Sequence, residues 1–187
     1  MPPKVKITKN DIINTAVELV RESGESAINA RAIASSLNCS TQPIFSNFCN
    51  MDELREAVIV CAYNSYLGFI KSEVESGKYP NYKAFGMAYI RFAKQEKELF
   101  KLLFMRNRTA EDLSPSPDFE ESVQMIMKAN NVTHEKAMLM HLEIWSCVHG
   151  IGAMLATSFL PLEYELISDM LTDVYQGIRK RHLSEEK

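Results

Sequence analysis

The sequence predicts an all-α protein of about nine helices, and two observations support this prediction. Apolar residues recur at steps of three and four along most of the 187 residues, which is the spacing of one face of a helix. Capping pairs stand before two of these runs, Thr8 with Asp11 and Asn50 with Glu53. We therefore expect a three-helix domain over residues 1–50 and a larger helical bundle over residues 51–187.

The first helix is expected over residues 8–22. Thr8 and Asp11 can cap its start, and Ser23-Gly24 can end it. Its apolar residues lie on one side and predict a face buried against the rest of the domain. These residues are Ile12, Ile13, Ala16, Leu19 and Val20.

Residues 29–48 read as two short helices joined by a tight turn. Ala30, Ile33, Ala34 and Leu37 recur at helical intervals and are mostly small, so one helix can lie close against another. The turn falls at residues 38–40, where the chain must visit positive φ, and asparagine tolerates this conformation well among non-glycine residues. Asn38 therefore suits the turn.

The second helix of this pair carries the side chains that could read DNA. We expect the Ser40 hydroxyl to cap it, with Pro43 in its first turn, where a missing N–H removes no helical bond. Ile44 and Phe48 should share its buried face with Cys39. The short polar side chains left outward can reach base edges and phosphates. They are Thr41, Gln42, Ser46 and Asn47.

The bundle is expected to begin with one long helix from Met51 to about Val74, ended by a break at residues 77–80. Further helices are predicted over residues 82–95, 99–105 and 119–129, with a loop over residues 106–118. The last two helices, about 134–158 and 162–181, carry more apolar surface than one domain can cover, which indicates a two-fold dimer interface. Gly150 and Gly152 weaken the first of them, so we expect a close neighbour at both.

These features together resemble the amino-terminal domain of the tetracycline-repressor (TetR) family of transcription regulators. The resemblance covers roughly residues 8–58 and rests on Gly24, Ile33-Ala34, Ser40, the segment at residues 45–48 and Leu54. Phe45 and Asn47 replace the family's usual tyrosine and histidine, and Met51 replaces a lysine that often touches a phosphate. The Trp145 and Val148-His149-Gly150 pattern is similar to one carboxy-terminal subclass of the family.

The resemblance implies a ligand-responsive repressor that binds a pseudo-palindromic DNA operator as a homodimer. The dimer would form through the last two helices. Candidate DNA contacts include the outward polar residues, the first helix and the start of the second. The set is Lys9, Asn29, Arg31, Ser40, Thr41, Gln42, Pro43, Phe45, Ser46 and Asn47.

Charge supports DNA binding only weakly. Residues 1–50 hold five cationic side chains and four carboxylates, a balance of +1. DNA-binding domains gain much of their affinity by neutralising phosphates, and this balance is low for such a domain. Lys4, Lys6 and Lys9 form either a DNA-binding arm or a solvated terminus.

The resemblance also implies a pocket for a small hydrophobic effector, with no cofactor or metal. Aromatic and thioether side chains on the bundle helices are candidates to line it, although such side chains are more often plain core. His149 could orient a polar ligand atom or be hydrogen-bonded within the core. The candidates are Tyr66, Phe69, Tyr89, Phe92, Phe100, Phe104, Met105, Met127, Trp145 and His149.

Other classes of function receive less support. The sequence has no HExxH motif, glycine-rich phosphate loop or nucleophile elbow, so catalysis is not expected. The four cysteines lack metal-finger spacing, and packing is favoured over redox sensing for Cys39 and Cys49. No apolar signal core or membrane-length apolar run is present, which favours a cytoplasmic protein. A helical adaptor or ligand-binding protein without a DNA role remains the alternative.

Overall fold

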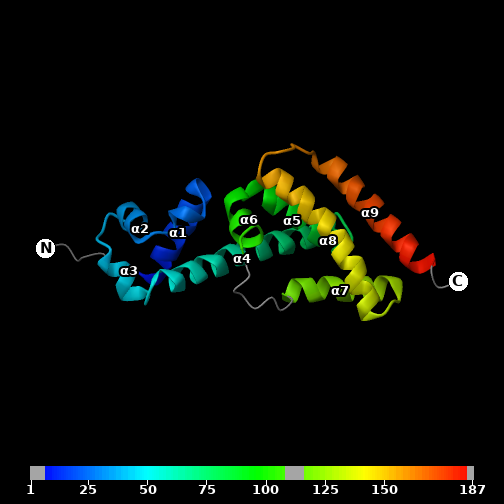
Figure 1. The fold of residues 1–187 in the computed structure, drawn as a ribbon, viewed down its shortest axis with the longest axis horizontal. Coiled ribbons are helices and arrows are strands. Elements are labelled where there is room, and N and C mark those ends of the chain that lie inside the picture. The colour runs from blue at the N-terminus through cyan, green and yellow to red at the C-terminus, as the bar shows by residue number, and fades with distance from the viewer. Residues whose placement is uncertain (1–6, 108–115, 185–187) are drawn as a thin grey trace. The chain divides into compact units, whose positions relative to one another are not determined.

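The computed structural model describes residues 7–107 and 116–184, and these residues form α-helices, one short 3₁₀ helix (Glu25–Ala27) and no strand. The predicted all-α class is therefore confirmed, and nine α-helices lie in the described ranges (Figure 1). They are α1 Lys9–Ser23, α2 Ala30–Ser36, α3 Gln42–Asn47, α4 Met51–Glu75, α5 Asn81–Gln95, α6 Lys97–Phe104, α7 Pro117–Asn130, α8 His134–Ala156 and α9 Tyr164–Ser184.

The chain divides into two compact units. Unit 1 consists of residues 1–65 and 96–106, and unit 2 consists of residues 66–95 and 107–187. Helix α4 thus begins in unit 1 and ends in unit 2, and α6 belongs to unit 1 although α5 belongs to unit 2. The boundary expected at residue 50 divides DNA binding from ligand binding and dimerisation. It stays a prediction, because the two units are defined by packing alone.

Unit 1 is built around α1, which contacts α2, α3 and α6. Its start is the expected capping box, with the Thr8 N–H donating to Asp11 Oδ2 at 2.8 Å and the Asp11 N–H donating to Thr8 Oγ1 at 3.2 Å. The bond from the Thr8 backbone is the main cause that lowers the pKa of Asp11. Ile12, Ile33, Ile44 and Phe100 are fully buried in this unit, so its core is apolar.

Ion pairs join α1 to α6 within unit 1. Arg21 Nε donates to Glu96 Oε2 at 2.9 Å, and Arg21 NH1 donates to Glu18 at 2.6 Å. The bond to Glu96 is the largest cause that raises the pKa of Arg21. Gly24 ends α1 at φ +77°, and a Cβ there would stand 3.0 Å from Glu98 Oε2. The Arg21–Glu96 bond therefore ties the last turn of α1 to the start of α6.

Unit 2 is organised by α8, which contacts α5, α7 and α9 (Figure 1). Gly86 on α5 allows close packing, because a Cβ there would stand 3.5 Å from Leu171 and 3.6 Å from Val148. By length and composition α8 could also cross a membrane, a test that core helices of soluble proteins pass as well. It packs against three helices of unit 2 on one side and leaves Leu139, Leu142 and Trp145 partly exposed.

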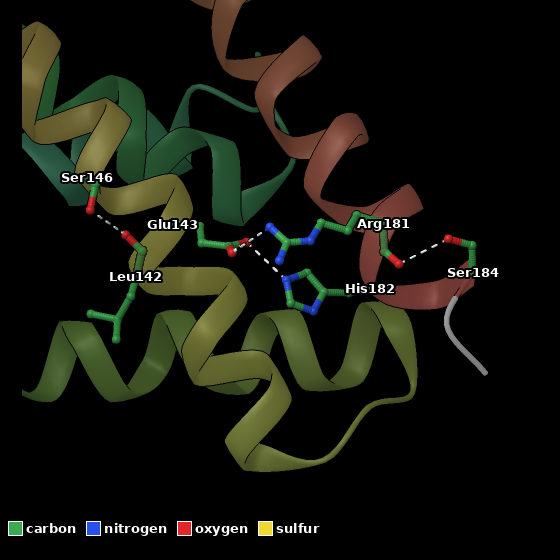
Figure 2. A network of polar contacts seen from close by, with 6 residues as sticks. All are labelled: Leu142, Glu143, Ser146, Arg181, His182 and Ser184. Atoms are coloured by element: carbon green, nitrogen blue, oxygen red, sulfur yellow. Dashed lines mark hydrogen bonds and ion pairs between the residues drawn. The ribbon is translucent and has the colours of Figure 1, made fainter.

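A polar contact joins α8 to α9 near the end of α9. The Glu143 carboxylate points toward Arg181 and His182, lying 3.0 Å from His182 Nε2 and 3.4 Å from Arg181 NH1 (Figure 2). His182 is buried, whereas Arg181 is exposed. Nothing in the sequence pattern indicated this contact, because 39 residues separate Glu143 from His182.

Three expectations for the bundle need correction. Helix α7 begins at Pro117 instead of residue 119, and α9 runs from Tyr164 to Ser184 instead of 162–181. Gly150 has no atom within 4 Å of where its Cβ would be, so the expected close neighbour is absent from the described part of the chain. Gly152 is buried as expected. Most of the expected loop at residues 106–118 lies outside the described residues.

Candidate DNA-binding surface and effector site

Helices α2 and α3 and the turn between them have the geometry that the sequence predicts. Asn38 adopts φ +51°, in the left-handed region that a short asparagine side chain tolerates. The Cys39 N–H then donates to the Ala34 carbonyl at 2.9 Å and closes the end of α2. The turn therefore works without the glycine that many such units carry.

The start of α3 differs from the prediction for Ser40. The helix begins at Gln42 with Thr41 as its N-cap, and no side chain caps it. The Thr41 carbonyl accepts the first helical bond, from the Phe45 N–H, so Ser40 lies one residue before the cap position. Pro43 is in the first turn, as predicted.

Buried apolar residues orient α3. Ile44 is fully buried and Phe48, which follows the helix, is 2% exposed, whereas Phe45 on the opposite side is 53% exposed. Gln42 and Ser46 are exposed and Asn47 is half-buried. We call Gln42, Phe45, Ser46 and Asn47 the reader surface.

Several candidate DNA contacts already have intramolecular partners. Ser46 Oγ donates to the Gln42 carbonyl at 2.9 Å, and Asn47 Nδ2 donates to the Pro43 carbonyl at 2.8 Å. Asn29 caps α2, since its Oδ1 accepts from the Ala32 N–H at 2.8 Å. Arg31 and Ser40 are exposed, and Thr41 is half-buried. Asn29 therefore stabilises the start of α2, and Ser46 and Asn47 stabilise α3, whether or not they also touch DNA.

Lys9 is held at the junction of α1, α3 and α4. Its Nζ donates to Glu53 Oε1 at 2.8 Å and lies 4.6 Å from the centroid of the Phe48 ring. The other Glu53 oxygen accepts from the Cys49 N–H at 2.7 Å, and the Glu53 N–H donates to Asn50 Oδ1 at 2.8 Å. The predicted cap by Asn50 is thus confirmed, and the Lys9 and Cys49 bonds lower the pKa of Glu53 to about 2.

In unit 2, four of the candidate effector residues form one aromatic group. The Tyr66 ring packs at 5.9 Å from Tyr89 and 5.6 Å from Phe92, and Phe69 packs at 5.4 Å from Phe92. These rings come from the end of α4 and from α5. The structure therefore brings together residues that sequence spacing alone could only place on separate helices.

Tyr89 links this group to α8. Its hydroxyl lies 2.8 Å from His149 Nδ1, and the His149 ring stacks on Trp145 with centroids 5.0 Å apart. Burial raises the pKa of Tyr89 and lowers the pKa of His149. Both groups are therefore neutral near pH 7, and the pair offers hydrogen bonds without a net charge.

A second tyrosine–histidine pair was missed at the level of the sequence. The Tyr82 hydroxyl lies 3.0 Å from His141 Nδ1, and Phe119 packs edge-on against the His141 ring at 4.5 Å. Burial lowers the pKa of His141 to about 4. The signal that could have revealed both pairs is spacing, because Tyr82 and Tyr89 are two turns apart on α5 and their partners are about two turns apart on α8.

The remaining effector candidates are divided between the units. Phe100, Phe104 and Met105 belong to unit 1, where Phe100 and Phe104 pack at 5.2 Å. Met127 is half-buried on α7 in unit 2. An open groove of about 510 Å³ runs along α9 and includes none of the ten candidates; Gln176, Arg179, Lys180, Leu183 and Ser184 line it.

Comparison with known families identifies the carboxy-terminal part of the chain. Residues 82–175, half of the sequence, match the family described as "Tetracyclin repressor-like, C-terminal domain". The chain belongs to the TetR family. It is accordingly a DNA-binding, ligand-responsive transcriptional regulator of the repressor type, and not an enzyme.

The TetR fold extends over the whole chain. The crystal structure of a TetR variant from Acinetobacter baumannii AYE in complex with minocycline matches it with a TM-score of 0.55. The match covers 97% of each chain at 13% sequence identity, so it concerns the fold alone. Comparison with curated protein sequences gives no significant match.

Proposed function

We propose that this TetR-family protein is a cytoplasmic homodimer that places the reader surface of each protomer in successive major grooves of a pseudo-palindromic operator. The supporting observation is that fully buried Ile44 and nearly buried Phe48 present Gln42, Phe45 and Ser46 to solvent. Dimeric helix-turn-helix proteins read half-sites about 34–36 Å apart, so the reader helices must be held at that spacing.

The open faces of α8 and α9 fit a second copy of the chain. Leu139, Leu142 and Leu166 are 49%, 42% and 51% exposed, and Gly150 and Gly177 leave open space where a Cβ would be. Small and apolar residues let two helices approach closely, and a two-fold axis would bury the same face of both protomers. This proposal also gives the close neighbour that Gly150 lacks within one chain.

The effector proposed for unit 2 is a small, largely hydrophobic molecule. The ring group of Tyr66, Phe69, Tyr89 and Phe92 supplies apolar contacts, and the Tyr89–His149 pair supplies neutral hydrogen bonds. Binding there would act on α4, which runs from unit 2 into unit 1, and so change the spacing of the reader helices. The effect requires unequal effector affinity for the two spacings.

Selection of bound fragments from sheared genomic DNA tests the DNA part of the proposal. A discrete pseudo-palindromic site should be recovered, and its affinity should fall steeply with salt. Gln42→Ala should relax base preference, and Arg31→Ala should weaken all sequences alike. Sequence-blind retention, or none, would support the adaptor alternative instead.

Sedimentation of the purified protein tests the dimer. Leu142→Glu would place a carboxylate on the shared face, and we expect this variant to be monomeric and folded. Exposed Glu121→Gln on α7 is a control that should stay dimeric. A wild-type monomer at micromolar concentration would contradict this part of the proposal.

A further inference from the structure

The cations of the DNA-binding region are largely occupied by carboxylates of the same chain. Lys9 pairs with Glu53, and Arg21 pairs with Glu18 and Glu96. Arg31 is the remaining cation among the described residues of the first fifty, and it is exposed. The +1 balance of residues 1–50 therefore overstates the charge that is available to phosphates, because Glu53 lies just beyond that range.

Glu53 is a fixed partner for Lys9. One carboxylate oxygen accepts from the Cys49 N–H at 2.7 Å, and the residue's own N–H bonds to Asn50, so the first turn of α4 holds the group in place. The Lys9 ammonium also lies over the Phe48 ring, directly after the reader helix. Glu53 thus neutralises a cation that lies directly after the reader helix.

Separating Lys9 from Glu53 nevertheless costs little free energy. The two side chains are 48% and 37% exposed, and exposed ion pairs contribute only about 0–1 kcal/mol. A DNA phosphate offers Lys9 a comparable partner and adds the release of a condensed counterion. A phosphate could therefore bind the same ammonium once Glu53 no longer competes for it.

We propose that Glu53 is a built-in competitor that limits DNA affinity by holding Lys9 away from the phosphate backbone. This inference rests on the proposed DNA binding by the reader surface. It makes Glu53 a positioning residue, which acts through Lys9 and sets how strongly the protein binds any duplex. Sequence preference remains with the reader surface.

The test compares Glu53→Gln with Glu56→Gln. Both remove one negative charge from the first part of α4, but Glu56 is exposed and has no described partner role at Lys9. Glutamine at position 53 keeps an oxygen that can accept from the Cys49 N–H. Binding to the operator and to a random-sequence duplex is measured by fluorescence anisotropy from 50 to 300 mM salt, with thermal unfolding to confirm folding.

Glu53→Gln should bind both duplexes roughly three- to tenfold more tightly at about 0.1 M salt, because each protomer gains one phosphate contact. The slope of log K against log salt should steepen by roughly 0.9 for each protomer. Glu56→Gln should leave the slope unchanged. Equal effects of the two substitutions, or an unchanged slope in Glu53→Gln, would overturn the inference.

Lys9→Gln completes the cycle and separates a structural role from competition. Alone it should weaken binding, because Glu53 is then left without its cationic partner, and combined with Glu53→Gln it should return the affinity to about the wild-type value. A gain that persists without Lys9 would show that Glu53 acts by another route. If the wild-type protein bound no DNA at all, the proposed function would fail first, and the two failures are thus distinguishable.

Discussion

The two units differ most in what they bury. The buried polar side chains among the described residues, Glu73, Ser122, His141 and His182, all belong to unit 2. Unit 1 buries only apolar side chains among the described residues, Phe48 and Phe100 among them, and its ion pairs are at least partly exposed. A close-packed apolar core resists deformation, whereas buried polar groups can hydrogen-bond an effector that reaches them. The contrast suits a rigid DNA reader joined to a unit that responds to an effector.

The largest loss of stability should come from truncating a side chain in the apolar core of unit 1. Ile44→Ala removes a fully buried side chain beneath the reader helix, and we expect the free energy of unfolding to fall by about 2–5 kcal/mol. Chemical denaturation followed by circular dichroism measures this change. Operator binding should be lost at temperatures where the wild-type protein still binds.

The neighbouring Phe45→Ala provides the matched control. Phe45 is 53% exposed on the same helix, so its removal should change the unfolding free energy by no more than about 0.5 kcal/mol. Operator affinity should still drop if Phe45 belongs to the reader surface. Similar destabilisation by the two substitutions would contradict the rigid, one-sided packing of α3.

Local features of unit 1 could be predicted because their partners are close in sequence. The Thr8–Asp11 box and the positive φ of Asn38 depend on residues within one turn of the chain. The Ser40 cap was wrong for a local reason too, since the helix starts one residue later than expected. An error of one residue moves a capping hydroxyl out of reach.

The polar contacts of unit 2 could not be predicted in the same way. Tyr82 and His141 are 59 residues apart, and Glu143 and His182 are 39 apart, so packing of whole helices decides these pairs. Periodicity placed Tyr89 and His149 on apolar faces but could not show that they meet. The ion pair of Lys9 with Glu53 was missed for the same reason, because 44 residues separate the two.

An intermediate effect should appear as a pH dependence of stability in unit 2. Burial lowers the pKa of His141 from its ordinary value near 6.5 to about 4, so the unfolded chain takes up a proton at a pH where the folded chain does not. Stability is therefore full above pH 6.5 and is lost as the pH falls toward 4, by roughly 2–3 kcal/mol. Denaturant unfolding at pH 7.5, 6.5, 5.5 and 4.5 measures this loss.

Carboxylates also titrate in this range, so the comparison must be made with a variant. His141→Asn keeps a polar side chain beside the Tyr82 hydroxyl but cannot take up a proton. We expect it to be less stable than the wild-type protein at pH 7.5, with a difference that shrinks at pH 4.5. A constant difference across the series would show that His141 does not titrate in the way its burial requires.

Two glycines distinguish the units by backbone geometry, and their expected effects on stability are smaller than that of Ile44→Ala. Gly24 ends α1 at φ +77° and ψ −176°, a region that is nearly restricted to glycine, so Gly24→Ala should destabilise by about 1–3 kcal/mol. The contact with Glu98 adds little, because the nearest atom is the end of a flexible side chain.

Gly86 is helical, and the 3.5 and 3.6 Å distances are ordinary contacts, so Gly86→Ala should be neutral or stabilise by up to about 1 kcal/mol. Thermal unfolding of the two variants side by side should therefore shift in opposite directions or leave Gly86→Ala unchanged. A loss of stability in Gly86→Ala would mean that α5 packs more tightly against α8 and α9 than these contact distances indicate.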